Sequence, residues 1–172
     1  TNIGAMFKDA TAFNKDIGGW DTSNVTIMSS TFNGASAFNG NVGSWNTGLV
    51  SSMGNMFKDA IVFNQNLNSW DVSRVTDMYG LFHNCSNYNQ PLDNWDVSSV
   101  TNMGCMFERC NKFNQLLNTW DVSSVNYMMC MFIYCVSFNQ NLENWDTRSL
   151  VNDYRMFEGC KNIKLFRNRI YV

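Results

Sequence analysis

Three groups of side chains in this sequence could do chemistry: cysteines, a single histidine and a row of aspartates. The cysteines repeat at a 25-residue spacing in two registers, Cys85, Cys110, Cys135 and Cys160 in one and Cys105 and Cys130 in the other. Alanine occupies the first register earlier in the chain, which is typical of a small apolar core position. Neighbouring repeats would bring thiols within disulfide reach, but equivalent sulfurs give no unique pairing. We therefore expect reduced structural thiols.

His83 is the only histidine, and the positions one period away hold Lys58 and Glu108. A position that varies in this way is expected to be exposed. A catalytic histidine needs a nucleophile or a carboxylate held against it, and the sequence identifies none. A zinc site is not expected either, because there is no C-x₂-C pair and no second histidine. These observations predict no enzymatic activity, no catalytic residue, no metal and no cofactor.

An acidic or amide residue recurs every 25 residues directly after a tryptophan. This candidate binding row consists of Asp21, Asn46, Asp71, Asp96, Asp121 and Asp146. The row could bind a cation or a basic partner, as aspartate ladders do in calcium-binding β-helices. Alternatively, each side chain caps the turn two residues further on. The capping interpretation is favoured, because every repeat needs a cap whatever the ligand.

The elements that position these residues belong to one repeated unit. Trp20, Trp45, Trp70, Trp95, Trp120 and Trp145 are spaced by 25 residues without insertion or deletion, and a phenylalanine series beginning at Phe7 keeps the same period. A fixed period of 20 to 50 residues is typical of stacked repeats. Each unit must therefore follow the same path as its neighbours.

Within a unit, the spacing L-x-x-W-x-V around Trp70 predicts a short strand with Asp71 pointing outward. The apolar residues Val25, Met28, Phe32 and Ala35 have the spacing of one helix face, which predicts about ten residues of helix. The Phe-Asn pairs that follow, such as Phe63-Asn64, predict a corner in which the asparagines form a ladder from repeat to repeat.

Together these patterns predict an α/β repeat fold. We expect a right-handed leucine-rich-repeat-like solenoid of 25-residue units, with short parallel strands on one face and short helices on the other. Residues 1–160 would form the solenoid, about six and a half units, and residues 161–172 a C-terminal capping segment. The open ends of such a solenoid could support self-association.

Composition limits the function classes. The chain has 172 residues, 45% of them hydrophobic, and a net charge of −2. Residues 161–172 carry four basic and no acidic side chains, which leaves −6 on the repeats and disfavours a nucleic-acid-binding surface. The sequence contains no run of 18 apolar residues, so no membrane span is expected. The chain begins in mid-repeat at Thr1, as expected for a fragment without its own targeting segment.

The recurring words Trp95-Asp96-Val97-Ser98-Ser99-Val100-Thr101 and Phe63-Asn64-Gln65-Asn66-Leu67 resemble one family. They are similar to the BspA-like, leucine-rich-repeat-type surface proteins, first noted as mycoplasma lipoproteins and also found in other bacteria, protists and large DNA viruses. The resemblance covers residues 1–160 and departs from the pattern at Trp45-Asn46-Thr47-Gly48.

The resemblance implies a cell-surface or virion-surface protein with no family-wide catalytic residues. We therefore expect a non-enzymatic repeat module that binds proteins or glycans in adhesion, or a structural component of such a surface. The alternative is a calcium-type, cation-dependent binding module or a repeat domain attached to an enzyme.

Overall fold

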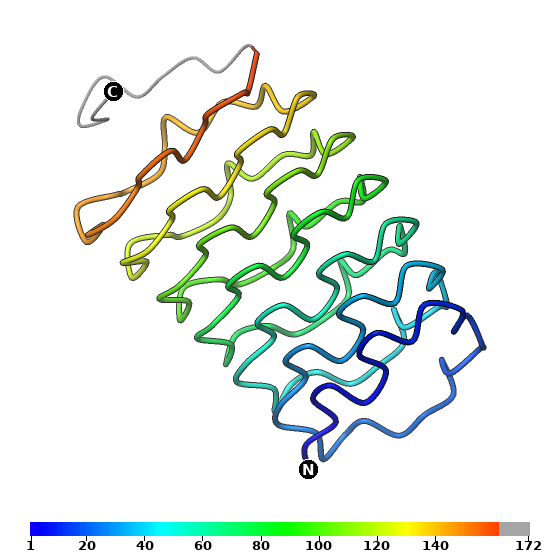
Figure 1. Ribbon diagram of the computed structural model, residues 1–172. Helices are drawn as coiled ribbons and strands as arrows, with labels where there is room; N and C mark the ends of the chain where they lie inside the picture. The colour runs from blue at the N-terminus through cyan, green and yellow to red at the C-terminus, as the bar shows by residue number, and fades with distance from the viewer. Residues whose placement is uncertain (162–172) are drawn as a thin grey trace.

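The chain forms a coil of stacked rungs, which the computed structural model describes for residues 1–161. Figure 1 shows successive rungs lying side by side in sequence order, from the N-terminal rung at one end to residue 161 near the other. Each rung has 25 residues and begins at a residue that pairs with its equivalent in the next rung through an isolated parallel bridge. These residues are Asn2, Ile27, Ser52, Asp77, Asn102, Tyr127 and Asn152. Apart from Lys161, the expected capping segment lies outside the described residues.

Between residues 1 and 161 there is no helix, and no strand beyond the single bridge residues. The predicted α/β class is therefore wrong, and so is the leucine-rich-repeat-like arrangement of helices opposite strands. The strands expected around the tryptophans are turns instead. In one of them the backbone N–H of Trp70 donates to the carbonyl of Leu67, three residues earlier, at 3.0 Å.

The predicted helices are replaced by runs of consecutive turns, here named the turn segments: residues 2–10, 27–35, 52–60, 77–85, 102–110, 127–135 and 152–160. Their backbone N–H groups alternate between two partners. Phe32 donates to the carbonyl of Met56 in the next rung at 2.8 Å, whereas Thr31 donates to Met28, three residues earlier, at 3.2 Å. The donors therefore alternate between joining rungs and closing turns, and no bond to the fourth preceding residue, as in an α-helix, occurs in the turn segments.

Backbone conformation explains why the turns do not continue as a helix. Each turn segment has two residues in the left-handed region, as at Asn55 and Asp59, with φ values of 55° and 59°. A positive φ at the third residue of a turn is the mark of a type II turn and is tolerated best by glycine and asparagine. It also interrupts a right-handed helix.

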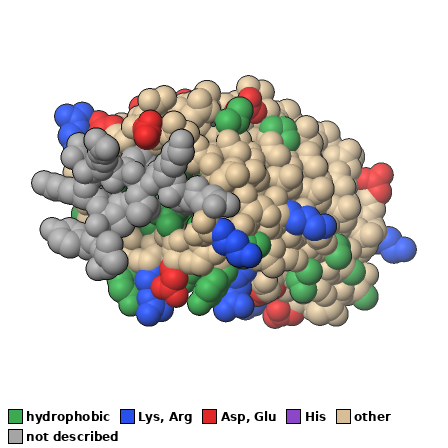
Figure 2. Space-filling model, turned by 90° about the horizontal axis from the view of Figure 1, so that it is seen from above, with side chains coloured by type: hydrophobic (Ala, Val, Ile, Leu, Met, Phe, Trp, Pro, Cys, Tyr) green, Lys and Arg blue, Asp and Glu red, His purple; other side chains and the backbone are tan. Residues whose placement is uncertain are grey.

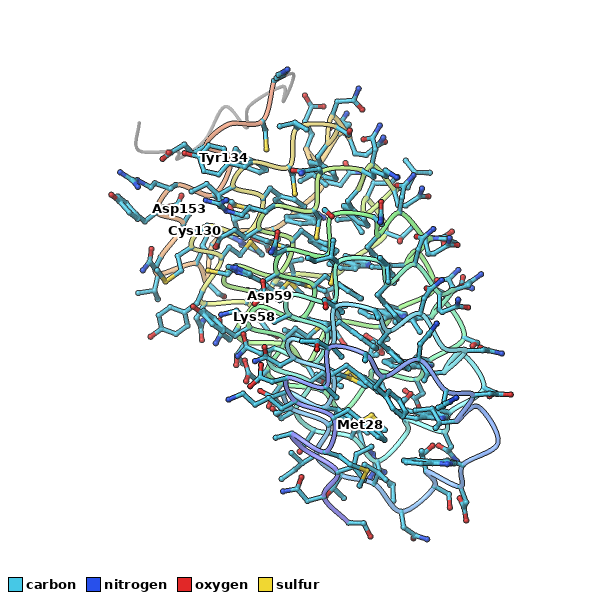
Figure 3. The ribbon with its side chains drawn as sticks, turned by 45° about the vertical axis from the view of Figure 1, so that its right-hand side comes forward. Met28, Lys58, Asp59, Cys130, Tyr134 and Asp153 are labelled. Atoms are coloured by element: carbon cyan, nitrogen blue, oxygen red, sulfur yellow. The ribbon has the colours of Figure 1, made fainter. Side chains whose placement is uncertain are left out.

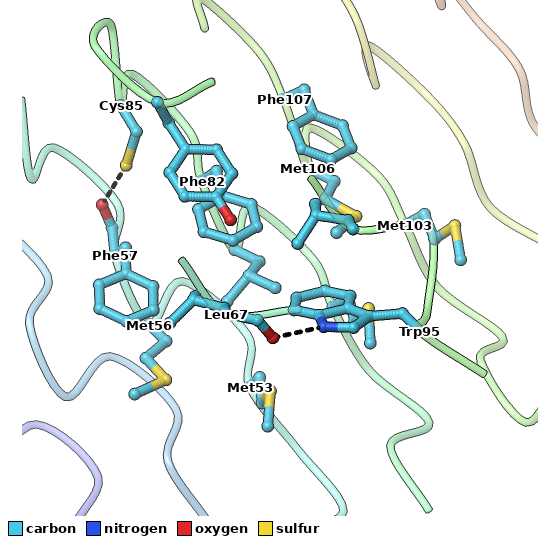
Figure 4. Packing of buried hydrophobic residues seen from close by; sticks show 14 of the residues in the cluster. Met53, Met56, Phe57, Leu67, Phe82, Cys85, Trp95, Met103, Met106 and Phe107 are labelled. Atoms are coloured by element: carbon cyan, nitrogen blue, oxygen red, sulfur yellow. Dashed lines mark hydrogen bonds between the residues drawn. The ribbon is translucent and has the colours of Figure 1, made fainter. Parts of the chain in front are cut away.

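The core consists of aromatic columns that run through the stack. The phenylalanine series from Phe7 to Phe157 places consecutive rings 5.4 to 5.8 Å apart. A second column, which includes Phe63, Tyr88 and Phe113, packs against the first, and its rings lie 4.0 to 4.3 Å from those of the same rung. Methionines, valines and leucines fill the remaining core (Figure 4).

Polar atoms inside the stack find partners in the preceding rung. The indole N–H of Trp95 donates to the carbonyl of Leu67 at 2.9 Å, and the same bond recurs for the other tryptophans from Trp45 to Trp145 (Figure 4). The predicted asparagine ladder is confirmed, since the backbone N–H of Asn64 donates to the side-chain oxygen of Asn39 at 2.9 Å and the pattern continues to Asn139. Register is thus fixed by specific hydrogen bonds as well as by packing.

Candidate functional site

The acidic row lies on the surface, and each of its members caps a turn. Asp71 accepts hydrogen bonds from the backbone N–H of Ser73 at 3.0 Å and from the Ser73 hydroxyl at 2.7 Å. Asn46 accepts the equivalent backbone bond from Gly48 at 3.1 Å, so the amide serves as well as the carboxylate. The remaining members accept the same backbone bond from the residue two positions on. The structure thus gives the row the capping role that the sequence favoured, and its role in binding stays a prediction.

These caps also set the charge of the row. Hydrogen bonds from the hydroxyl and the backbone of Ser73 lower the pKa of Asp71. Hydrogen bonds from the Arg148 side chain lower the pKa of Asp146 to about 2. Hydrogen bonds from the hydroxyl and the backbone of Ser123 lower the pKa of Asp121. These three members of the row are therefore ionised at neutral pH while their oxygens are engaged in turns.

Other polar side chains that recur from rung to rung are used in the same way. The Gln65 amide donates to the carbonyl of Asn39 at 2.8 Å, and Gln140 repeats this bond to Asn114 at 3.1 Å. The Thr76 hydroxyl donates to the carbonyl of Ser51 in the preceding rung at 3.3 Å. Repetition on this side of the molecule is explained by the stack itself.

The turn segments carry a different surface, because their outward residues change from rung to rung. The position of His83 holds Lys8, Asn33, Lys58, Glu108, Ile133 and Glu158 in the other rungs. We call this surface the turn face; it consists of the outward side chains of the seven turn segments. Figure 3 shows Lys58, Asp59, Cys130 and Tyr134, which belong to it, along one side of the stack.

Aromatic and cationic side chains gather on the C-terminal half of the turn face. Exposed tyrosines occur there at Tyr79, Tyr127, Tyr134 and Tyr154. The guanidinium of Arg109 lies 5.4 Å from the centre of the Tyr134 ring, and that of Arg155 lies 5.1 Å from the Tyr154 ring. The view in Figure 2 likewise shows exposed hydrophobic side chains next to basic and acidic ones along one edge. Tyrosine and arginine are the residue types that dominate binding hot spots.

A second cluster lies on the same face, around His83. Its Nδ1 atom is 3.4 Å from a carboxylate oxygen of Glu108. The Cys105 thiol donates to the Tyr79 hydroxyl at 3.6 Å. A ring nitrogen of His83, the sulfur of Cys105 and a carboxylate oxygen of Glu108 all lie within 4.8 Å of one another. These three atoms could hold a metal ion.

Partial burial favours the neutral forms of His83 and Cys105. Desolvation lowers the pKa of His83 and outweighs the opposing effect of Glu108. Desolvation also raises the pKa of Cys105 to about 12. The hydrogen bond with Cys105 raises the pKa of Tyr79 to about 12. At neutral pH the thiol of Cys105 is therefore protonated.

The sequence showed Glu108 one period after His83, but this variation was interpreted as exposure and not as a contact between neighbouring rungs. Glu108 follows His83 by one period, and Cys105 follows Gly80 by one period. Since Gly80 and His83 belong to one turn, closed by a 3.0 Å backbone bond, the stack places all three side chains together. The signal that could have found the cluster is the chemistry of the residues one period apart: an imidazole at His83 and a carboxylate at Glu108 are complementary.

The core cysteines are separate from this cluster. The thiols of Cys85, Cys110 and Cys135 are buried, and each donates to the carbonyl of the phenylalanine 28 residues earlier (Figure 4 shows Cys85). Burial raises the pKa of all three thiols well above its ordinary value. Thiols held in this way pack as core residues and are poor nucleophiles.

The chain matches the family described as mycoplasma protein of unknown function, DUF285, once over residues 1–100 and again over residues 65–168. The two matches together span most of the chain. The chain belongs to the DUF285 family. The two matched ranges overlap over residues 65–100. Such an overlap is expected for a chain of equivalent repeats, to which one family pattern can be aligned in more than one place.

Membership in DUF285 supports the expected resemblance to mycoplasma repeat proteins at the family level. None of the curated proteins and none of the solved structures matches the chain significantly. The described part of this DUF285 chain contains no helix that is long and apolar enough to cross a membrane. The function of the chain therefore has to be argued from its surfaces.

Proposed function

We propose that this chain is a non-enzymatic binding module whose turn face contacts a protein partner at a cell or particle surface, as in BspA-like adhesion proteins. The proposal is carried by one observation: four exposed tyrosines lie on the turn face, two of them beside arginines. The acidic row and the recurring glutamine and threonine side chains, in contrast, are engaged in caps and in bonds between rungs.

The chemistry of the turn face suits a protein partner. Tyr127 and Tyr154 are 46% and 60% exposed, and Arg155 stacks over the second ring. Rigid aromatic rings lose little conformational entropy on binding, and arginine adds charge and directional hydrogen bonds. Neighbouring rungs repeat such contacts at short intervals, so weak contacts add up along the stack.

The test uses variants whose new residues already occur at the equivalent positions of other rungs. Tyr127→Ser, Tyr134→Asn and Tyr154→Gly copy Ser52, Asn84 and Gly54. The matched control combines Asp71→Asn, Asp96→Asn and Asp121→Asn, which removes the charge of the acidic row but keeps its caps, as Asn46 does. Both triple variants are expected to fold.

The immobilised chain and both variants are tested against purified extracellular-matrix proteins and against a glycan array. The proposal predicts saturable binding to a protein that falls tenfold or more, about 1.4 kcal/mol or more, in the tyrosine variant and is unchanged in the asparagine variant. Binding that is lost only in the asparagine variant would return the site to the acidic row. Saturable binding to glycans alone, or to nothing in either panel, would contradict the proposal.

A further inference from the structure

We propose that His83, Cys105 and Glu108, together with Cys130, form a binding site for a divalent transition-metal ion of the zinc class. The inference is independent of the proposed binding function. It starts from the three side chains whose ligand atoms already lie within 4.8 Å of one another. They come from two adjacent turn segments and approach one another from the two rungs.

The spacing is close to that of a formed site. Around tetrahedral zinc, with metal–ligand distances near 2.0 to 2.3 Å, neighbouring donor atoms are about 3.3 to 3.8 Å apart. The distance from His83 Nδ1 to the nearer oxygen of Glu108 is 3.4 Å. The Cys105 sulfur lies within 4.8 Å of both atoms, so it can take a third corner of a tetrahedron if its side chain moves toward the shared ion.

The fourth corner is supplied by the next rung. Cys130 occupies the position of Cys105 one period later, so the stack places it in the adjacent rung, beside the three side chains. Cys130 is only partly buried, so its sulfur can turn toward a shared ion. Two sulfurs, an imidazole and a carboxylate suit zinc and not calcium or magnesium, which take oxygen ligands.

Other rungs of the described chain lack this set. At the positions of Cys105 and Glu108, the second rung has Ser30 and Asn33, and the third has Asn55 and Lys58. The two adjacent thiols, the histidine and the glutamate coincide only across the three rungs from Asp77 to Val151. A bound ion would join these rungs through side chains, in addition to their backbone bonds.

Charged side chains of both signs surround the histidine of the proposed site. Lys58 and Arg109 are cations that act on His83, whereas Asp59 and Glu108 are anions that act on it. On binding, the Cys105 and Cys130 thiols each lose a proton to solvent as their sulfur–metal bonds form, and His83 binds as the neutral ring. The Tyr79 hydroxyl, which now accepts from the Cys105 thiol, then donates to the thiolate and orients it.

The experiment uses the full 172-residue chain, fully reduced, with all six thiols counted before metal is added. Calorimetric titration with Zn²⁺ is compared for the native chain, for Cys105→Ser and for His83→Asn, which copy Ser30 and Asn33 from the second rung. The control is Cys110→Ala, a core thiol replaced by the residue present at Ala35 and Ala60. Co²⁺ serves as the spectroscopic probe, and Ca²⁺ is titrated in parallel.

We expect one Zn²⁺ per chain, with proton release, a higher melting temperature and a thiolate-to-cobalt charge-transfer band with Co²⁺. Affinity should fall on the order of a hundredfold or more in Cys105→Ser and His83→Asn, as for lost metal ligands, and stay unchanged in Cys110→Ala. The absence of the charge-transfer band in the native chain would overturn the proposal, however the variants fold. Equal affinity in Cys105→Ser and the native chain, or displacement of Zn²⁺ by equimolar Ca²⁺, would overturn it too.

Discussion

Tyr88 shows how strictly the interior constrains a single residue. It stands in a column that otherwise contains phenylalanine, with its ring stacked 6.0 Å from Phe63 and 6.2 Å from Phe113. Its hydroxyl is the one buried side-chain oxygen or nitrogen in residues 1–161 without a hydrogen-bond partner. Burial raises the pKa of this hydroxyl well above its ordinary value, so it is neutral. A buried hydroxyl without a partner keeps its desolvation cost uncompensated.

Replacing this residue, Tyr88→Phe, should therefore stabilise the protein. The ring and its stacking remain, and the unsatisfied hydroxyl is removed, so we expect a gain of about 1 to 3 kcal/mol in the free energy of unfolding. Urea denaturation measures the change. The reciprocal variant Phe113→Tyr places the same hydroxyl in the next rung and should destabilise the protein by a similar amount. A loss of stability in Tyr88→Phe would show that the hydroxyl has a partner in solution.

The sequence predicted the contacts of those residues whose side chains are needed to satisfy a backbone group. The ladder from Asn39 to Asn64 could be predicted, because a corner without a sheet partner needs a side chain to satisfy its backbone. The contact between His83 and Glu108 could not be read from local sequence, because it is formed by the stacking of two rungs. The period placed the two residues in neighbouring rungs, but only the structure shows that their side chains meet.

At the scale of elements, the turn segments show why a periodic pattern can mislead. Successive type II turns point a side chain inward every three or four residues, as at Met28, Phe32 and Ala35, and so does a helix. The two differ in backbone hydrogen bonding, which apolar spacing does not report. The left-handed residues, such as Gly80 and Asn84 with φ values of 60° and 59°, carry the distinguishing signal. Residues of other types, such as Cys105 and Arg109, hide that signal in neighbouring rungs.

The capping role of the acidic row can be tested with one position and two replacements. Asp71→Ala should lower the melting temperature, because the backbone N–H and the hydroxyl of Ser73 lose their acceptor. Asp71→Asn should leave it nearly unchanged, since Asn46 forms the same cap with Gly48. Thermal unfolding followed by tryptophan fluorescence compares the two. Equal losses in both variants would mean that the carboxylate charge, and not the cap, is what the rung requires.

At the scale of the whole molecule, stability should vary along the stack. Trp95 is buried between two rungs, with its indole N–H bonded to the carbonyl of Leu67 and its ring stacked 6.4 Å from Trp120. Trp95→Ala should cost about 3 to 5 kcal/mol through the cavity that it leaves. Trp145→Ala, nearer the end of the described stack, should cost less if unfolding begins there, as nearest-neighbour stacks allow. Equal losses in chemical denaturation would indicate one cooperative unit instead.

The period, the stacking of equivalent residues and most of the core could be predicted from the sequence. An unbroken spacing from Trp20 to Trp145 leaves each rung only one way to pack on the next. The class of element could not be predicted, because apolar spacing fixes which side chains face inward and not how the backbone between them is bonded. The candidate sites differ in a similar way: the acidic row repeats one residue type and was visible in the sequence, whereas the cluster at His83 combines different residue types at equivalent positions and was not expected.

The central claim is that rungs are joined by the backbone of their turn segments, without helices. It is tested most directly by nuclear magnetic resonance detection of couplings across hydrogen bonds, which link each amide nitrogen to the carbonyl carbon that it bonds. The amide of Met103 donates to the carbonyl of Tyr127 in the next rung at 2.8 Å, so the account predicts a cross-peak between these two residues. A helix would instead connect Met103 to Ser99, four residues earlier. A cross-peak at Ser99, and none at Tyr127, would contradict the account.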